Sequence, residues 1–242
     1  MSLVVMRCQP LRRALAVPIN QNSGENMKIK GRTSHVRCHL LFSIALDAQK
    51  RVANEPEQAL VSLIFSYSAL EAFINESLSV TEQFSGGRRS DDEKKFYALM
   101  QQLQEKKDST EQKYHLSKIL FTGSPWQKGD EPFQRFDFLK RLRNELIHKK
   151  SETTETIKDL STKKTSVTLS KNTQSLVRGL KERKLIDESA EYGSWLDAIQ
   201  NETFAKWCCD TAIIMSDAFI NILPSGKYQE IFREMLEFER NG

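Results

Sequence analysis

The sequence predicts an all-α protein with an antiparallel four-helix-bundle core and additional short helices. Three observations predict this fold class. Apolar residues recur at intervals of three and four along most of the 242-residue chain, as one face of a helix requires. Only 10 Gly and 6 Pro are present, which is too few for a turn-dense β-sandwich. Two Ser-x-x-Glu/Gln patterns, typical of the helix capping box, occur in the middle of the chain.

Two long helices are predicted in the first third of the chain. The first covers about 35–54, and its apolar positions are Leu40, Leu41, Ile44, Ala45 and Ala48. The second covers 56–84, since Pro56 is tolerated in a first helical turn and Gly86-Gly87 ends the pattern. Its apolar stripe consists of Leu60, Leu63, Ile64, Tyr67, Leu70, Ile74 and Leu78.

The middle of the chain predicts two short helices and one long one. Two capping boxes open the short helices at about 91–106 and 110–121. The boxes are formed by Ser90 with Glu93 and by Ser109 with Gln112. A loop from Gly123 to Asp130 separates them from a helix that starts at Pro132 and ends at about His148. The core face of that helix is Phe136, Leu139, Leu142 and Leu146.

Beyond this helix the pattern is weaker. Residues 151–175 are rich in Ser and Thr, which favours a basic loop, with a short hairpin around Val167 and Leu169 as the alternative. Helices are then expected at about 174–185 and 195–223. A C-terminal amphipathic helix is expected at 226–240.

The composition leaves the functional class open. Charged residues make up 28% of the chain, and the net charge of +4 is compatible with a nucleic-acid partner without requiring one. No run of about 18 apolar residues is present, so no transmembrane helix or membrane partner is expected. The four cysteines contain no CxxC pair, and Cys208 and Cys209 are adjacent in an apolar stretch. This usage favours buried thiols and a cytoplasmic location.

The first 27 residues differ from the rest of the chain. Their three arginines face a single acidic residue, Glu25, and the apolar run from Leu3 to Met6 is too short for a secretory signal. We interpret residues 1–27 as a disordered or mis-annotated leader, with an organelle presequence as the alternative. Residues 28–242 are then expected to form a single domain.

Most familiar catalytic signatures are missing, including GxxxxGK[ST], GxGxxG, GxSxG and HExxH. His35, Cys38 and His39 share one helix end, but a zinc site needs three or four ligands and no further His or Cys lies nearby in sequence. We therefore expect no metal and no cofactor.

The informative stretch runs from Lys140 to His148. Asn144 and His148 are four residues apart and share a helix face, and Arg143 is next to Asn144. On the helix 56–84, Glu71 and Asn75 lie in line with the apolar stripe. A buried carboxylate needs a partner, and a bidentate pair with Arg143 would supply one. The alternative is that Glu71 sits in water at the edge of a wide stripe.

The segment Ser68 to Leu78, followed by Arg143-Asn144-Glu145-Leu146-Ile147-His148, resembles the HEPN superfamily. The hallmark of that family is an Arg, four to six residues and then a His, often with Asn directly after the Arg. The resemblance covers roughly residues 35–223 and maps the motif onto Arg143, Asn144 and His148. Arg141 offers a second register with six intervening residues. A Tyr found two residues after the His in one toxin subgroup is replaced here by Lys150.

The resemblance implies a homodimer in which two Arg–His motifs face each other. It implies a metal-independent endoribonuclease of the toxin or phage-defence type that cleaves single-stranded RNA, with an antitoxin protein as a further partner. Catalysis would rest on Arg143, Asn144 and His148, supported by Glu71, Asn75 and Arg141. Region 149–184 holds ten Lys or Arg against four Asp or Glu. Its basic residues would bind RNA; those singled out are Lys149, Lys150, Lys163 and Lys164.

Some members of the family have lost catalysis. The rival interpretation is therefore a non-catalytic helical interaction or RNA-binding module, in which Arg143 and His148 only brace the bundle. The basic region would then be an ordinary solvated loop.

Overall fold

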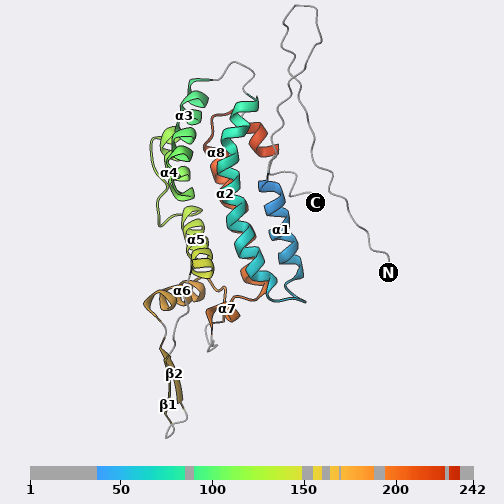
Figure 1. Cartoon of the computed structure of the whole chain (residues 1–242), viewed down its shortest axis with the longest axis vertical. Coiled ribbons are helices and arrows are strands. Elements are labelled where there is room, and N and C mark those ends of the chain that lie inside the picture. Colours follow the sequence, from blue (N-terminus) through green and yellow to red (C-terminus); the bar gives the residue numbers. More distant parts are fainter. Residues whose placement is uncertain are drawn as a thin grey trace, which may run out of the picture. The chain divides into compact units, whose positions relative to one another are not determined.

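The computed structural model describes residues 37–84, 90–148, 155–159, 164–168, 170–187, 194–226 and 229–234. All of them belong to one compact unit, Arg37–Gly242. Apart from one short hairpin, the regular structure in these ranges is helical (Figure 1). The predicted all-α fold class is therefore confirmed. The predicted leader, 1–27, lies outside the described residues.

Four long helices form the core: α1 (Cys38–Arg51), α2 (Gln58–Phe84), α5 (Phe133–His148) and α8 (Glu202–Ile222). Helix α2 packs against each of the other three, and the pairs α1–α2 and α5–α8 are antiparallel (Figure 1). Helices α2 and α8 run in the same direction, because Ser66 lies beside Cys209 and Phe73 lies beside Phe219 further along both helices. This arrangement is that of a bundle of alternating helices.

Helices α3 (Asp91–Glu105) and α4 (Thr110–Thr122) pack together beside α2. Both begin as predicted. Ser90 accepts the backbone N–H of Glu93, whose carboxylate accepts the N–H of Ser90. Ser109 and Gln112 exchange the same two hydrogen bonds. These bonds satisfy backbone donors that the first helical turn leaves unpaired, and therefore fix where each helix starts.

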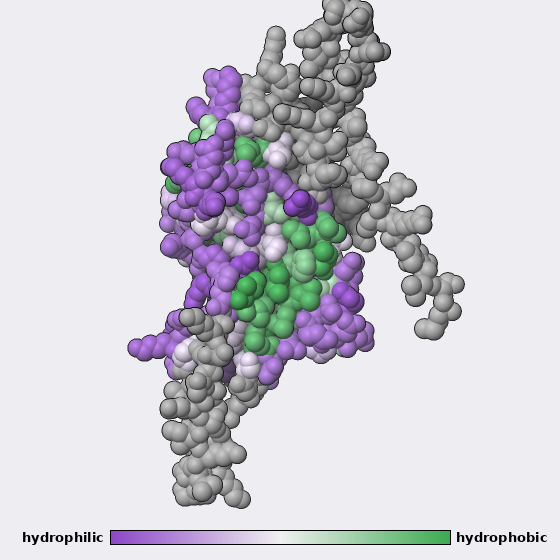
Figure 2. Space-filling view, viewed as in Figure 1, coloured by the Kyte–Doolittle hydropathy of each residue, from purple (hydrophilic) through white to green (hydrophobic). Residues whose placement is uncertain are grey.

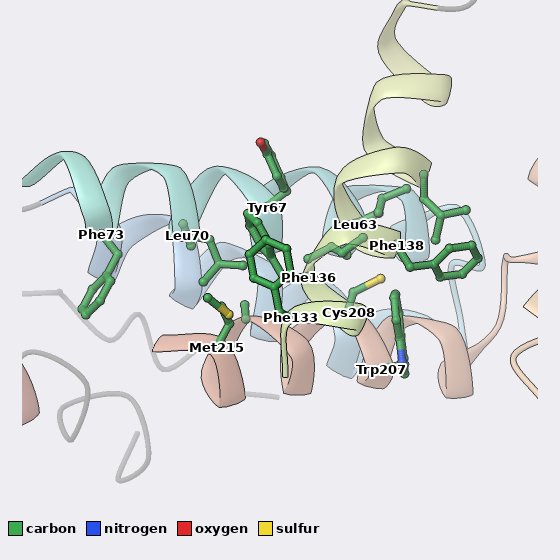
Figure 3. Packing of buried hydrophobic residues seen from close by; sticks show 14 of the residues in the cluster. Leu63, Tyr67, Leu70, Phe73, Phe133, Phe136, Phe138, Trp207, Cys208 and Met215 are labelled. Atoms are coloured by element: carbon green, nitrogen blue, oxygen red, sulfur yellow. The ribbon is translucent and has the colours of Figure 1, made fainter. Parts of the chain in front are cut away.

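The core is aromatic where α2, α5 and α8 meet. Tyr67 stacks on Phe136, with ring centroids 6.1 Å apart, and Phe138 meets Trp207 edge-on at 5.8 Å. Figure 3 shows these four side chains in one packed cluster. Such pairs contribute about 0.5–1.5 kcal/mol each beyond the area they bury. The cluster therefore fixes α5 against both α2 and α8.

The segment after α5 contains strands β1 (Glu155–Asp159) and β2 (Lys164–Thr168), which pair antiparallel. The hairpin thus replaces the loop that the composition favoured, and Val167 lies in it as the alternative expected. Helix α6 (Lys171–Glu182) follows and begins earlier than predicted, because the Ser170 hydroxyl accepts the N–H of Thr173.

The continuous helix predicted over 195–223 is wrong. It is divided into α7 (Trp195–Ala198) and α8, with Asn201 between them. The Asn201 side-chain oxygen accepts the N–H of Phe204, and its amide donates to the carbonyls of Leu185 and Ala198. An N-cap residue leaves the helical conformation, so this asparagine interrupts the helix. Of the C-terminal helix expected at 226–240, residues 229–234 are described and helical.

Further expectations concern membranes, thiols and metals. Across the ranges that the structure describes, no helix is both long and apolar enough to cross a bilayer. Cys208 and Cys209 are buried as predicted, and burial raises the pKa of the Cys208 thiol well above its usual range. The same ranges contain no group of three or more His, Cys, Asp or Glu arranged to hold a metal ion.

Candidate functional site

The three motif residues meet at the C-terminal end of α5. The Arg143 Nη1 atom donates to Asn144 Oδ1 at 3.1 Å and lies 3.5 Å from His148 Nε2. Asn144 and His148 are exposed, and Arg143 is half-buried. The spacing-based prediction that these polar groups gather on one helix end is thus met, and their contacting atoms face solvent.

The guanidinium of Arg143 is supported from below by an aromatic ring. Its central carbon lies 5.3 Å from the ring centroid of Tyr67, which is 6% exposed and stacks on Phe136. A cation over an aromatic face is stabilised by about 0.5–2 kcal/mol, depending on burial. The Arg143 Nε atom is buried without a hydrogen-bond partner among the described residues, so the ring is the main support of this end of the side chain.

In the contact between Arg143 and His148, the chemistry of the two groups determines which one donates the hydrogen bond. A guanidinium only donates hydrogen bonds, so His148 Nε2 accepts from it only when that nitrogen carries no proton. At 3.5 Å the contact is long, which leaves Nε2 able to exchange Arg143 for another donor. The pair therefore places an imidazole nitrogen that can accept a proton beside a fixed positive charge, at an exposed helix end.

The predicted pairing of Arg143 with Glu71 is not found. Within the described part of the chain, no ion pair joins these two side chains. Glu71 is half-buried at the edge of the stripe, where its charge acts on Lys113 and Tyr67. Asn75 Oδ1 accepts a 2.6 Å hydrogen bond from Lys113 Nζ. The predicted partner of Glu71 and Asn75 is therefore wrong, because Lys113 of α4 occupies that place instead of a residue of α5.

Lys113 is the residue that sequence reasoning missed here. It is 7% exposed, and burial lowers the pKa of its ammonium group while Glu71 and Asp108 oppose that change. Tyr67 was expected only as a core residue, although it lies one turn before Glu71. The sequence does not reveal that a lysine of α4 contacts α2, because no local pattern specifies which helices become neighbours.

A second charged cluster joins α4 to α5, one turn before Asn144. Lys140 contacts the carboxylates of Glu111 and Asp137, and His115 lies 3.9 Å from Glu111. Burial alone would lower the pKa of Lys140, but the hydrogen bonds to these carboxylates outweigh it and raise that pKa. This cluster ties α4 to α5, and the buried His115 Nδ1 atom has no hydrogen-bond partner among the described residues.

The remaining predicted site residues divide into two groups. Arg141 turns toward α6, where its Nη2 donates to Ser175 Oγ at 3.2 Å, and it does not join the Arg143–His148 contact. Lys149, Lys150 and Lys163 lie outside the described residues. Lys164 is the first residue of β2, and the structure describes only its backbone.

An apolar surface lies over α1 and α2, shown in green in Figure 2. Leu40 of α1 is 62% exposed, and Ile44 beside it is half-buried. On α2, Val61, Ile64 and Phe65 are half-buried as well. We call these five residues the α1–α2 apolar face. Ile64 lies one turn before Tyr67, so the face adjoins the support of Arg143.

Comparisons of this chain with protein-family models, with curated proteins and with solved structures found no match.

Proposed function

We propose that this protein is a metal-independent endoribonuclease that cleaves single-stranded RNA at the Arg143–His148 pair. The observation that carries the proposal is the placement of a guanidinium 3.5 Å from an imidazole nitrogen on an open helix end. The resemblance of the motif and its surroundings to the HEPN superfamily supports the same chemistry. A toxin or phage-defence role, with an antitoxin partner, follows from that resemblance alone.

RNA carries its own nucleophile, the 2′-hydroxyl beside each phosphodiester. His148 Nε2 takes the 2′-OH proton as O2′ forms a bond to phosphorus, and Arg143 stabilises the charge that develops on the phosphoryl oxygens. The bond from phosphorus to O5′ breaks, and O5′ receives a proton. The products are a 2′,3′-cyclic phosphate and a 5′-hydroxyl end. Asn144, bonded to Arg143, holds the guanidinium over the helix end.

A single imidazole cannot be both the base and the acid in one step. A two-fold dimer supplies a second His148, because an isologous interface places the same surface on both subunits. We propose the α1–α2 apolar face as that interface. On α2 this face continues to Tyr67, whose ring supports Arg143. A two-fold axis near Ile64 therefore brings Tyr67 and Arg143 of both subunits to the interface.

The test is cleavage of single-stranded RNA by the purified protein in EDTA. Removal of the imidazole in His148→Ala should reduce the rate by about 10²–10⁴-fold. Arg143→Ala should lose a comparable factor, whereas the exposed Arg51→Ala serves as the control and keeps the wild-type rate. Since His148 is exposed, His148→Ala should change the free energy of unfolding by less than about 0.5 kcal/mol. Equal rates for wild type and His148→Ala contradict the proposal.

The α1–α2 apolar face also favours a second function, a non-catalytic interaction module. A large apolar surface on a folded protein is typical of an interaction site. In that case wild type cleaves no RNA, and His148→Ala and Arg143→Ala both lower thermal stability or dimerisation. Light scattering of Ile64→Asp separates the cases further. If Ile64→Asp loses both the dimer and RNA cleavage, the ribonuclease is supported. If the wild-type protein is a monomer, a site shared between two subunits is excluded.

A further inference from the structure

A second set of arginines lies on the side of α5 that faces α6 and α8. A groove of about 410 Å³ at this junction is lined by Glu131, Gln134, Arg135, Glu182, Arg183 and Trp207. The guanidinium of Arg183 lies 4.2 Å from the ring centroid of Phe138, and that of Arg135 lies 5.6 Å from the ring of Trp207. Arg141, next to the groove, lies 5.9 Å from Phe138.

These arginines are each held by a hydrogen bond to an uncharged group of the fold. Arg135 Nε donates to Thr211, Arg141 Nη2 donates to Ser175, and Arg183 Nη1 donates to the Gly179 carbonyl. None of the three forms an ion pair with a carboxylate in the described part of the chain. Burial lowers the pKa of Arg183, the carboxylates of Glu182 and Glu131 oppose that change, and the charges of Arg141 and Arg135 add to it.

Helix α6 approaches α5 closely at one point, between Gly179 and Phe138. Gly179 is buried, and a Cβ atom there would lie 2.7 Å from the Phe138 ring. The absence of that atom lets α6 approach until the guanidinium carbon of Arg183 lies 4.2 Å from the Phe138 ring centroid. A guanidinium carries five N–H groups, so an arginine held by a ring and one hydrogen bond keeps further N–H groups that can donate to phosphate oxygens.

One face of α5 connects a groove residue with the motif. Gln134 lines the groove, Arg141 follows seven residues later, and His148 follows after another seven, so all three lie on one helix face. Each interval of seven residues spans about 10 Å. A strand leaving the Arg143–His148 pair along this face therefore meets Arg141 first and Arg135 and Arg183 next.

We propose that Arg135, Arg141 and Arg183 form a phosphate-binding track for the RNA strand that flanks the cleaved bond. The proposal rests on the proposed function for the identity of the strand. Two carboxylates, of Glu131 and Glu182, also line the groove, and Glu182 is drawn toward Arg178 at 3.8 Å. These two acidic residues oppose phosphate binding. Removal of the carboxylates should therefore strengthen RNA binding, whereas removal of the arginines should weaken it.

The experiment measures binding of a short fluorescein-labelled single-stranded RNA to full-length protein at several salt concentrations. All proteins carry His148→Ala, so that the RNA stays intact. The slope of log Kobs against log[salt] is negative, and Arg135→Gln/Arg183→Gln should make it less steep by about 1.4. Each lost phosphate contact on a single strand removes about 0.7 from its magnitude. The control Lys50→Gln/Arg51→Gln removes two charges from the exposed end of α1 and should leave the slope unchanged.

Two further variants separate binding from damage to the fold. Arg183→Lys keeps the charge and should keep the slope of the His148→Ala parent protein. Glu131→Gln/Glu182→Gln should bind RNA several-fold more tightly than that parent. Unfolding cannot imitate a gain in affinity. The track is contradicted if the arginine double variant binds like the α1 control, even when the wild-type chain cleaves RNA. If the wild-type chain binds RNA through these arginines and does not cleave it, the track stands and the ribonuclease is wrong. No RNA binding at any salt concentration overturns both.

Discussion

Removal of the Tyr67 ring should release Arg143, and the size of this effect follows from the structure. The guanidinium carbon lies 5.3 Å from the ring centroid, within the range of about 6 Å in which cation–π attraction acts. Tyr67 is 6% exposed and Arg143 is half-buried, so the attraction should lie between the exposed and the desolvated limits, about 0.5–2 kcal/mol.

A double-mutant cycle measures this term without any activity assay. Urea unfolding of wild type, Tyr67→Leu, Arg143→Met and the double variant gives the coupling free energy between Tyr67 and Arg143. The cost of the cavity left by Tyr67→Leu is common to the single and the double variant and therefore cancels. We expect about 0.5–2 kcal/mol. Tyr67→Phe keeps the ring and should therefore keep both the coupling and the cleavage rate.

Arg141 provides the matched control for this cycle. Its guanidinium lies over Phe138 rather than Tyr67, so the cycle of Tyr67 with Arg141 should be additive within about 0.5 kcal/mol. A coupling near zero for Tyr67 with Arg143, or an equal coupling for Arg141, would refute the claim that Tyr67 holds the site arginine.

Two further predictions concern stability. Gly179→Ala places a Cβ atom 2.7 Å from the buried Phe138 ring, and the overpacking of about 1–3 kcal/mol should exceed the gain of about 1 kcal/mol in helix propensity. Its thermal midpoint should fall, and a rise would show that α6 is not packed closely on α5. Burial lowers the pKa of His115 below 6.5, so the unfolded chain binds the proton first and stability is lost as pH falls below about 6.5. The loss of unfolding free energy between pH 7 and pH 5 should be smaller in His115→Gln; an equal loss would mean that His115 does not contribute.

The sequence predicted most where structure is determined locally. Ser90 and Ser109 form their capping boxes as expected, since each box needs only residues three apart. Asn201 shows the opposite case. Its role in dividing α7 from α8 depends partly on the carbonyl of Leu185, sixteen residues earlier, which a periodic apolar pattern does not reveal.

The candidate site shows the same division. Arg143, Asn144 and His148 lie together as predicted, because one helix positions all three. The supporting residues were assigned less well, because Glu71 and Asn75 face α4 and its buried Lys113 instead of Arg143. The support of Arg143 by Tyr67 and the row of arginines beside α6 arise from tertiary packing, so spacing along one helix could not predict them.

Analysis of the RNA ends after cleavage in EDTA tests the central claim most directly. Attack by the 2′-hydroxyl, with His148 as base and Arg143 on the phosphoryl oxygens, leaves only 2′,3′-cyclic phosphate and 5′-hydroxyl ends. Products with 3′-hydroxyl and 5′-phosphate ends, which arise when water attacks phosphorus, would contradict the account.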